Sequence, residues 1–169
     1  MVWKKRALNL AAVAALLLTG GARAEPVLRL PDIDHIVVRK AVRTMTLYAD
    51  GRAVRTIAAI QLGDVPIGHK HFEGDERTPE GRYTIDYGNP DSGYHLSLHI
   101  SYPNDADRAY AEAQGRSPGG MIFIHGQPNG LPFGRVPGDW TDGCIAVSND
   151  EMEALWEAVP DGTAIDILP

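Results

Sequence analysis

The only cysteine of the chain, Cys144, is the side chain best suited to covalent chemistry. It lies in the run Thr141-Asp142-Gly143-Cys144-Ile145, downstream of the pair His125-Gly126. A thiol becomes a strong nucleophile when a histidine can accept its proton, and a glycine beside it lets the backbone adopt unusual dihedral angles. A lone cysteine can also be a buried inert residue or form an intermolecular disulfide. The neighbours favour a nucleophile, Cys144, served by a general base and acid, His125.

The first residues of the chain indicate export. A basic start, Lys4-Lys5-Arg6, precedes an apolar stretch at 7–18, and Ala22-Arg23-Ala24 has small residues where signal peptidase reads them. We predict a signal peptide over 1–24, cleaved after Ala24. The apolar stretch is shorter than the roughly 20 residues that a membrane span needs, so we expect no stable membrane anchor. The mature product would be periplasmic or secreted, where a lone thiol has no partner for a disulfide within the chain.

The charge balance narrows the choice of partners. The whole chain has 16 basic and 22 acidic side chains. The predicted leader contains four of the basic residues and none of the acidic ones, so the mature chain would have 12 basic residues and a formal charge of −10. This balance argues against nucleic acid or an anionic membrane surface as a partner. About 145 residues would remain, enough for one domain with a substantial core, and we expect a monomer.

The hydrophobic pattern predicts a mainly β chain. The run 43–49 alternates, Asp50-Gly51 is a strong signal for a hairpin turn, and 53–60 returns as the partner strand. A helix is expected at 105–114, and Ser148 and Glu151 form the capping box of another. We expect a β-sandwich or barrel with small helices and antiparallel hairpin connections, whose other strands are 36–38, 82–86, 94–102, 121–124, 144–147 and 163–168.

Two segments of the sequence together resemble a known family. One is His125-Gly126 followed by Thr141-x-Gly143-Cys144, and the other runs from Gly63 to Gly68 and on through Gly74-Asp75-x-x-Thr78-Pro79-Glu80-Gly81. In this order they resemble the L,D-transpeptidase catalytic domain, the YkuD-like family. The resemblance implies a barrel-like β-sandwich with two or three short helices, and action on peptidoglycan stem peptides in the periplasm or at the cell surface. It makes 25–35 an N-terminal lead-in and 36–169 the catalytic domain.

The resemblance also implies a mechanism. Cys144 would attack the carbonyl of a diamino acid in a stem peptide, with His125 taking the thiol proton. The thioester would then pass to an amine of a second stem peptide, which forms a cross-link, or to water. Backbone N–H groups of Cys144 and Gly143 would hold the oxyanion, and a carbonyl at Gly126 would orient the imidazole. No metal or other cofactor is required.

The chain departs from the commonest pattern of that family at two positions. Asp142 stands where histidine usually precedes Gly-Cys, and Ala146 stands where an arginine often follows, which places the chain in a subgroup with Asp-Gly-Cys. A carboxylate near the thiolate raises the thiol pKa, unless Asp142 points away or pairs with His125 or a substrate amine. Some members of the family with a similar run are regarded as hydrolases, so a carboxypeptidase or amidase that cuts cross-links or wall-attached protein is the alternative. A catalytically inactive wall-binding domain is a third possible function.

Further polar and aromatic residues are candidates for substrate binding. Thr141 and Trp140 adjoin the motif, and His95 and His99 share the polar face of the expected strand at 94–102. Four residues along a strand separate two side chains by about 13 Å, too far for one metal ion, so we expect a cleft-lining role rather than a zinc site.

Overall fold

The computed structural model describes residues 29–131 and 134–169. The predicted signal peptide at 1–24, with its cleavage site after Ala24, lies outside the described residues. Within the described ranges, no helix is long and apolar enough to cross a membrane. The predicted lead-in is in part built into the fold, because Ile33 is only 1% exposed and donates its backbone N–H to the carbonyl of Ala158 at 2.7 Å.

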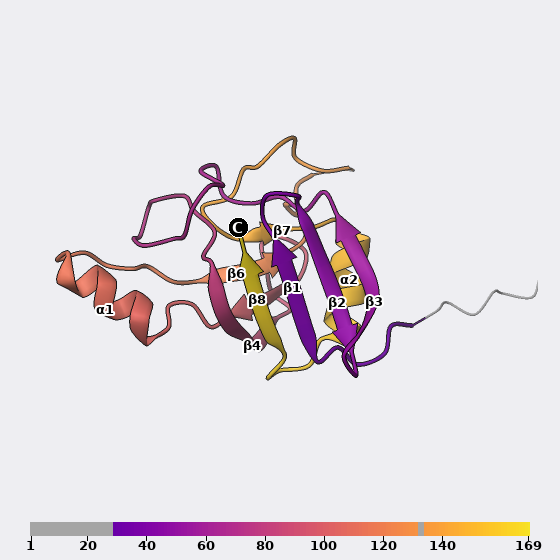
Figure 1. Ribbon diagram of the computed structural model, residues 1–169. Helices are drawn as coiled ribbons and strands as arrows, with labels where there is room; N and C mark the ends of the chain where they lie inside the picture. The colour runs from indigo at the N-terminus through magenta and orange to yellow at the C-terminus, as the bar shows by residue number, and fades with distance from the viewer. Residues whose placement is uncertain (1–28, 132–133) are drawn as a thin grey trace, which may run out of the picture.

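The described residues form one curled sheet of eight strands with two helices, as Figure 1 shows. The strand order is β3-β2-β1-β8-β4-β5-β6-β7. The mainly β, barrel-like architecture with two or three short helices is therefore confirmed. The strands are β1 (His35–Arg39), β2 (Thr44–Ala49), β3 (Arg52–Ala58), β4 (Gly81–Asn89), β5 (Ser97–Ile100), β6 (Ile122–His125), β7 (Ile145–Ala146) and β8 (Ala164–Leu168).

The β2–β3 hairpin follows directly from the local sequence. Asp50 and Gly51 have φ of 50° and 72°, and two consecutive positive φ values are what a two-residue turn of matching twist requires. Met45 and Leu47 on β2 are fully buried, so this strand turns its apolar face to the core.

Two pairings differ from the antiparallel connections expected from the hairpin signals. β8 pairs in parallel with β1, and β6 pairs in parallel with β7. Isolated bridges from Gln61 to Ala146 and from Gly63 to Thr141 then join the segment after β3 to the segment around β7. These long-range bonds bring the two ends of the sheet together, which gives the barrel-like curl.

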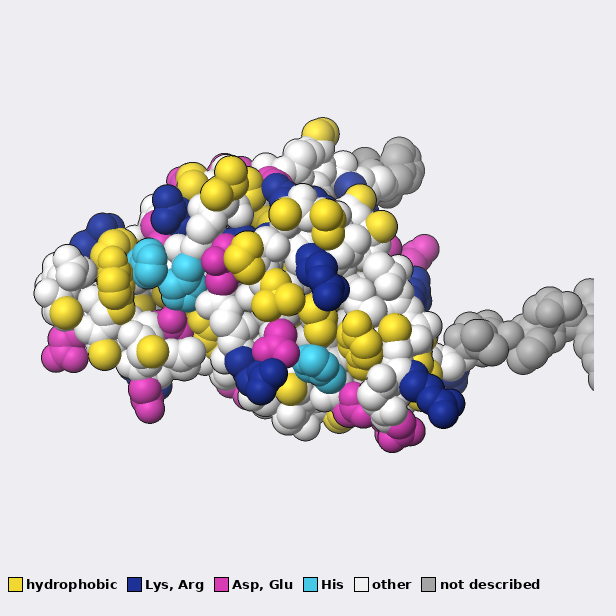
Figure 2. Space-filling model, in the orientation of Figure 1, with side chains coloured by type: hydrophobic (Ala, Val, Ile, Leu, Met, Phe, Trp, Pro, Cys, Tyr) yellow, Lys and Arg dark blue, Asp and Glu magenta, His cyan; other side chains and the backbone are white. Residues whose placement is uncertain are grey.

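The two helices have different places in the fold. The helix α1 (Asp105–Ala113) stands away from the sheet in Figure 1, whereas α2 (Asn149–Ala158) packs on β5 and β6. Both begin with a capping box, Asn104 with Asp107 and Ser148 with Glu151, and the second of these was predicted. On the face of the molecule in Figure 2, acidic and basic side chains are interspersed.

The strand expected at 94–102 is shorter in the structure, and this difference matters for the site. β5 contains only Ser97–Ile100. The N–H of Tyr94 donates to Ser92 Oγ at 3.1 Å, and the N–H of His95, whose φ is 69°, donates to Asn129 Oδ1 at 2.7 Å. Side-chain acceptors thus replace the strand partners of this stretch, and Tyr94 is released from the sheet.

Candidate active site

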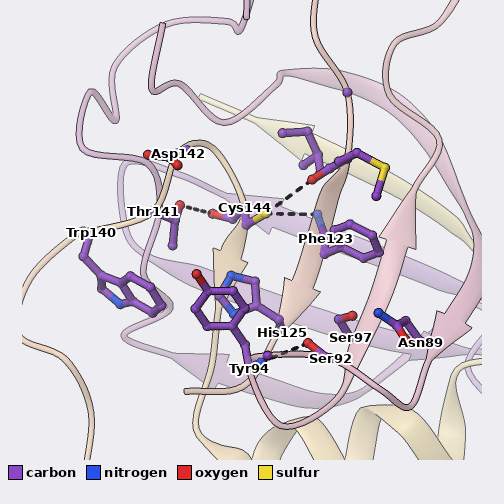
Figure 3. Close-up of a pocket in the computed structure, with 14 residues that line it drawn as sticks. Asn89, Ser92, Tyr94, Ser97, Phe123, His125, Trp140, Thr141, Asp142 and Cys144 are labelled. Atoms are coloured by element: carbon purple, nitrogen blue, oxygen red, sulfur yellow. Dashed lines mark hydrogen bonds between the residues drawn. The ribbon is translucent and has the colours of Figure 1, made fainter. Parts of the chain in front are cut away.

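The ends of two parallel strands bring the cysteine and the histidine together. His125 is the last residue of β6, and Cys144 directly precedes β7. The register pairs Ile124 with Ile145 and His125 with Ala146, so Cys144 lies level with Phe123, two positions from His125 along the neighbouring strand. Both line a pocket of about 570 Å³, which Figure 3 shows.

The turn before Cys144 requires a glycine for steric reasons. Gly143 has a φ of 122°, and a Cβ atom there would lie 2.5 Å from the carbonyl oxygen of Arg77. Its N–H donates to Thr141 Oγ1 at 3.2 Å, and the Thr141 hydroxyl donates to the Cys144 carbonyl at 2.7 Å. The Gly143 N–H therefore already has an acceptor in Thr141 Oγ1, and its role as an oxyanion donor stays a prediction. Thr141 lines the pocket, yet it is only 4% exposed and holds the turn.

The Cys144 thiol is bonded to backbone groups. Its Sγ accepts from the N–H of Phe123 at 3.4 Å and donates to the carbonyl of Met121 at 3.7 Å. Burial raises the pKa of the thiol to about 11, the Phe123 N–H opposes that shift, and the Asp142 carboxylate adds to it. Cys144 is consequently a neutral thiol at neutral pH.

The imidazole of His125 has a defined tautomer. The ring is buried, and its Nδ1 lies 2.7 Å from the carbonyl oxygen of Gly126. A carbonyl only accepts, so Nδ1 carries the proton and Nε2 is left as the basic atom. Burial lowers the pKa of His125, and the Gly126 carbonyl opposes that shift. A larger residue at 126 would crowd its neighbours, because a Cβ would lie 2.6 Å from Asn149 Oδ1 and 3.0 Å from the backbone carbonyl oxygen of Tyr94.

Aromatic rings form one wall of the pocket. Trp140, a residue expected to adjoin the site, lines it together with Tyr94 and Phe123. The sequence alternation placed Tyr94 on a strand face with apolar neighbours, which is why its position in the pocket was not predicted. The irregular stretch Ser92-Gly93 before it was the available signal that a regular strand does not begin there.

His95 and His99 are not among the side chains that line the pocket. The Nε2 atom of His95 pairs with Glu153 at 3.0 Å, and the Nδ1 atom of His99 pairs with Asp86 at 2.6 Å. Their geometry gives no support to a substrate-binding role. In the part of the chain that the structure describes, no group of three or more His, Cys, Asp or Glu side chains could hold a metal ion.

The two unusual positions of the motif differ in their surroundings. Asp142 is exposed at the rim of the pocket, where it raises the thiol pKa by its charge. Ala146 is completely buried in β7. The site thus presents a carboxylate to solvent near the thiol, and no side chain at 146 reaches the pocket.

The other segment that resembles the family, residues 63–81, lies between β3 and β4 and supports the turn before Cys144. Asp75 accepts from Lys70 Nζ at 2.9 Å and from three backbone N–H groups. Lys40, which is 2% exposed, donates to Glu80 at 2.9 Å and to the carbonyl of Thr78 at 2.9 Å. These polar side chains satisfy one another, and the segment that they hold supplies the carbonyl that packs against Gly143.

The fold and the pocket together define a barrel-like β domain with a cysteine and a histidine at the ends of adjacent parallel strands. Residues 33–167 match the model of the L,D-transpeptidase catalytic domain family, YkuD, and the chain belongs to that family. A search of curated proteins found no match.

Solved structures with the same fold come from several bacteria. The helical cell shape determining protein Pgp2 from Campylobacter jejuni is 30% identical, with a TM-score of 0.65 over 81% of this chain and 48% of that one. Bd1075 from Bdellovibrio bacteriovorus is 24% identical, with a TM-score of 0.55 over 81% of this chain and 48% of that one. An L,D-transpeptidase from Xylanimonas cellulosilytica is 18% identical, with a TM-score of 0.52 over 85% of this chain and 64% of that one. The chain spans about half the length of the first two, and the last two show the fold alone.

Proposed function

We propose that the protein is a peptidoglycan-modifying cysteine L,D-transpeptidase that acts on stem peptides through a thioester. The observation that carries the proposal is the single pocket that holds both the Cys144 thiol and the buried His125, with Nε2 of the imidazole left as its basic atom. Membership of the family supplies the substrate class.

The protonation states favour a proton transfer that accompanies attack. Because the thiol pKa is raised and the imidazole pKa is lowered, a preformed thiolate–imidazolium pair is disfavoured. With a stem peptide bound, Cys144 would turn from the Met121 carbonyl and give its proton to His125 Nε2 while Sγ attacks the carbonyl carbon of the diamino acid. The C–N bond to the D-amino acid then breaks, and the imidazolium returns the proton to the leaving amine.

The second half of the reaction resolves the thioester. The amine of another stem peptide attacks the thioester carbonyl, gives a proton to His125 and releases the thiol, which leaves a new amide as the cross-link. The backbone N–H of Cys144 is the proposed oxyanion donor, because the neighbouring N–H of Gly143 is already bonded to Thr141.

Hydrolysis of the same thioester by water is the second candidate. The exposed carboxylate of Asp142 and the buried methyl group of Ala146 favour it, since both differ from the residues common in the family. In that case the protein would act as a carboxypeptidase or amidase of the Asp-Gly-Cys subgroup. Asp142 would then orient the attacking group or His125.

The cellular setting is part of the proposal. We propose that residues 36–169 are the catalytic domain and that the protein works in the periplasm or cell wall after removal of residues 1–24. The 30% identity with a cell shape determining protein supports a role in shaping the wall.

The test uses purified wall muropeptides. The protein should convert them to cross-linked dimers with loss of a terminal D-amino acid, as read by mass spectrometry, and Cys144→Ala should give no product while it keeps the parent circular dichroism spectrum. Shortened monomers without dimers would establish the hydrolase instead. If no product forms and neither a carbapenem nor a thiol alkylator adds mass at Cys144, the cysteine mechanism is refuted and the wall-binding domain is the hypothesis to test next.

A further inference from the structure

Three aromatic rings meet beside the nucleophile. The centroid of the Tyr94 ring lies 4.6 Å from that of His125, and the Trp140 ring lies 5.6 Å from His125 and 5.7 Å from Tyr94. The planes of Tyr94 and His125 are inclined by 31°, whereas Trp140 meets His125 edge to face at 64°. We call Tyr94 and Trp140 the aromatic clamp, because they contact two sides of one imidazole.

The backbone of the fold holds both members of the clamp. The N–H of Tyr94 donates to Ser92 Oγ at 3.1 Å, and its carbonyl oxygen packs so closely on Gly126 that a Cβ there would lie 3.0 Å away. The N–H of Trp140 donates to the carbonyl of Leu62 at 3.1 Å. The clamp is therefore fixed to two segments far apart in the sequence, one between β4 and β5 and one before the nucleophile.

The exposed fractions of the rings indicate that the clamp covers the histidine. His125 is 4% exposed although it lines an open pocket, while Tyr94 is 42% exposed. Figure 3 shows the Tyr94 ring over the imidazole. The exposed ring thus takes the place that solvent would otherwise occupy above the histidine.

Burial has more influence on the pKa of His125 than the polar groups around the ring do. Nδ1 of the His125 ring donates a hydrogen bond to the carbonyl oxygen of Gly126. The titratable groups that share the pocket are the Cys144 thiol and Asp142, from the segment before β7, and the Tyr94 hydroxyl, from the segment before β5. Burial is the largest cause of the lowered pKa of His125, and the Gly126 carbonyl opposes it. An aromatic cover that excludes water supplies that burial.

We propose that Tyr94 and Trp140 are positioning residues that hold the His125 ring toward Cys144 and keep water from it. The catalytic role of the clamp rests on the proposed function, whereas its effect on the pKa of His125 does not. A covered imidazole stays neutral to lower pH, so it remains a base where an exposed histidine would already be protonated.

The experiment is a histidine titration by NMR with the protein as it exists. The His125 signal is assigned by its loss in His125→Gln and followed from about pH 4 to pH 8 in the parent, Tyr94→Phe and Tyr94→Ala. The parent and Tyr94→Phe should titrate below 6.5, and Tyr94→Ala should move toward that ordinary value. Trp140→Leu should move the pKa in the same direction and serves as a second measure if Tyr94→Ala does not fold.

A matched control is available in the same molecule. Tyr87 is 40% exposed and stacks on His99 at 4.5 Å, outside the pocket. Tyr87→Ala removes an equal ring from another histidine and should leave the His125 titration unchanged. A shift of His125 in Tyr87→Ala as large as in Tyr94→Ala would overturn the proposal.

The kinetic readout separates this inference from the proposed function. If substrate turns over, kcat/KM at about pH 5.5 should fall in Tyr94→Ala by at most about tenfold, because a histidine with its ordinary pKa is only about one-tenth neutral at that pH, and Tyr94→Phe should keep the parent value. Failure of turnover in every form, with the NMR shift present, refutes the proposed function and leaves the clamp intact. A parent His125 that titrates at 6.5 or above, or that does not shift in Tyr94→Ala and Trp140→Leu, refutes the clamp.

Discussion

Replacement of Gly143 by alanine tests whether the turn before Cys144 sets the position of the thiol. In the structure this residue has a φ of 122°, a region that L side chains rarely adopt. A Cβ atom would lie 2.5 Å from the carbonyl oxygen of Arg77 and 3.3 Å from Cδ1 of Ile122. The carbonyl belongs to the backbone and cannot rotate away, so either the turn or the segment around Arg77 must move.

The expected magnitude has two parts. A positive φ costs an L residue about 1–2 kcal/mol, and forcing an extra methyl group into a packed region costs about 1–3 kcal/mol. Gly143→Ala should therefore lower the free energy of unfolding by about 2–5 kcal/mol. Because Cys144 is the next residue, a displacement near 1 Å should also lower turnover by about 100-fold.

The assay is urea denaturation, with intact-mass measurement of acylation at Cys144 as the functional readout. Gly51→Ala is the control, because Gly51 has a φ of 72° and no atom within 4 Å of the added Cβ. It should lose only the backbone part, about 1–2 kcal/mol, and keep full acylation. Equal losses of stability and of acylation in the two variants would refute the steric account of the Gly143 turn.

Three other predictions follow from the charges of the molecule. Because burial raises the pKa of Cys144 to about 11, its alkylation by iodoacetamide in the free protein should accelerate about tenfold per pH unit up to about pH 10, and a plateau below pH 9 would contradict this. Asp142→Asn should lower that pKa and speed alkylation at pH 8, and Asp142→His should change the ratio of cross-linked to hydrolysed muropeptides; parent-like behaviour in both assays would mean that Asp142 has no catalytic role. Lys40→Met should lower the free energy of unfolding in urea by about 3 kcal/mol because it strands Glu80, and adding Glu80→Gln should recover part of the loss. A double variant no more stable than Lys40→Met would argue against that coupling.

Local signals in the sequence were enough for much of the fold. Asp50-Gly51 predicted the β2–β3 hairpin because few other residues accept two positive φ values in succession. Ser148 and Glu151 predicted the start of α2 because the capping box is formed by residues only three positions apart. The candidate chemistry is local as well, since Cys144 and His125 were each marked by a neighbouring glycine.

Other features depended on contacts between distant parts of the chain. The parallel pairings of β1 with β8 and of β6 with β7 join segments that no short-range pattern relates. Tyr94 was expected on a regular strand, but Asn129, from another segment, provides an acceptor for the N–H of the residue that follows it. His95 and His99 likewise pair with the carboxylates of Glu153 and Asp86, and their spacing in the sequence does not predict these pairs.

Turns and helix starts could be predicted from the sequence, because dihedral preferences and capping act over a few residues. Which groups surround the thiol depends on contacts between distant segments. Packing set the Phe123 N–H against Cys144 Sγ, placed Asp142 at the rim of the pocket and put Tyr94 over His125. These outcomes follow from burial and long-range hydrogen bonds, which exist only once β6 and β7 lie side by side and the segments between β3 and β5 pack around them.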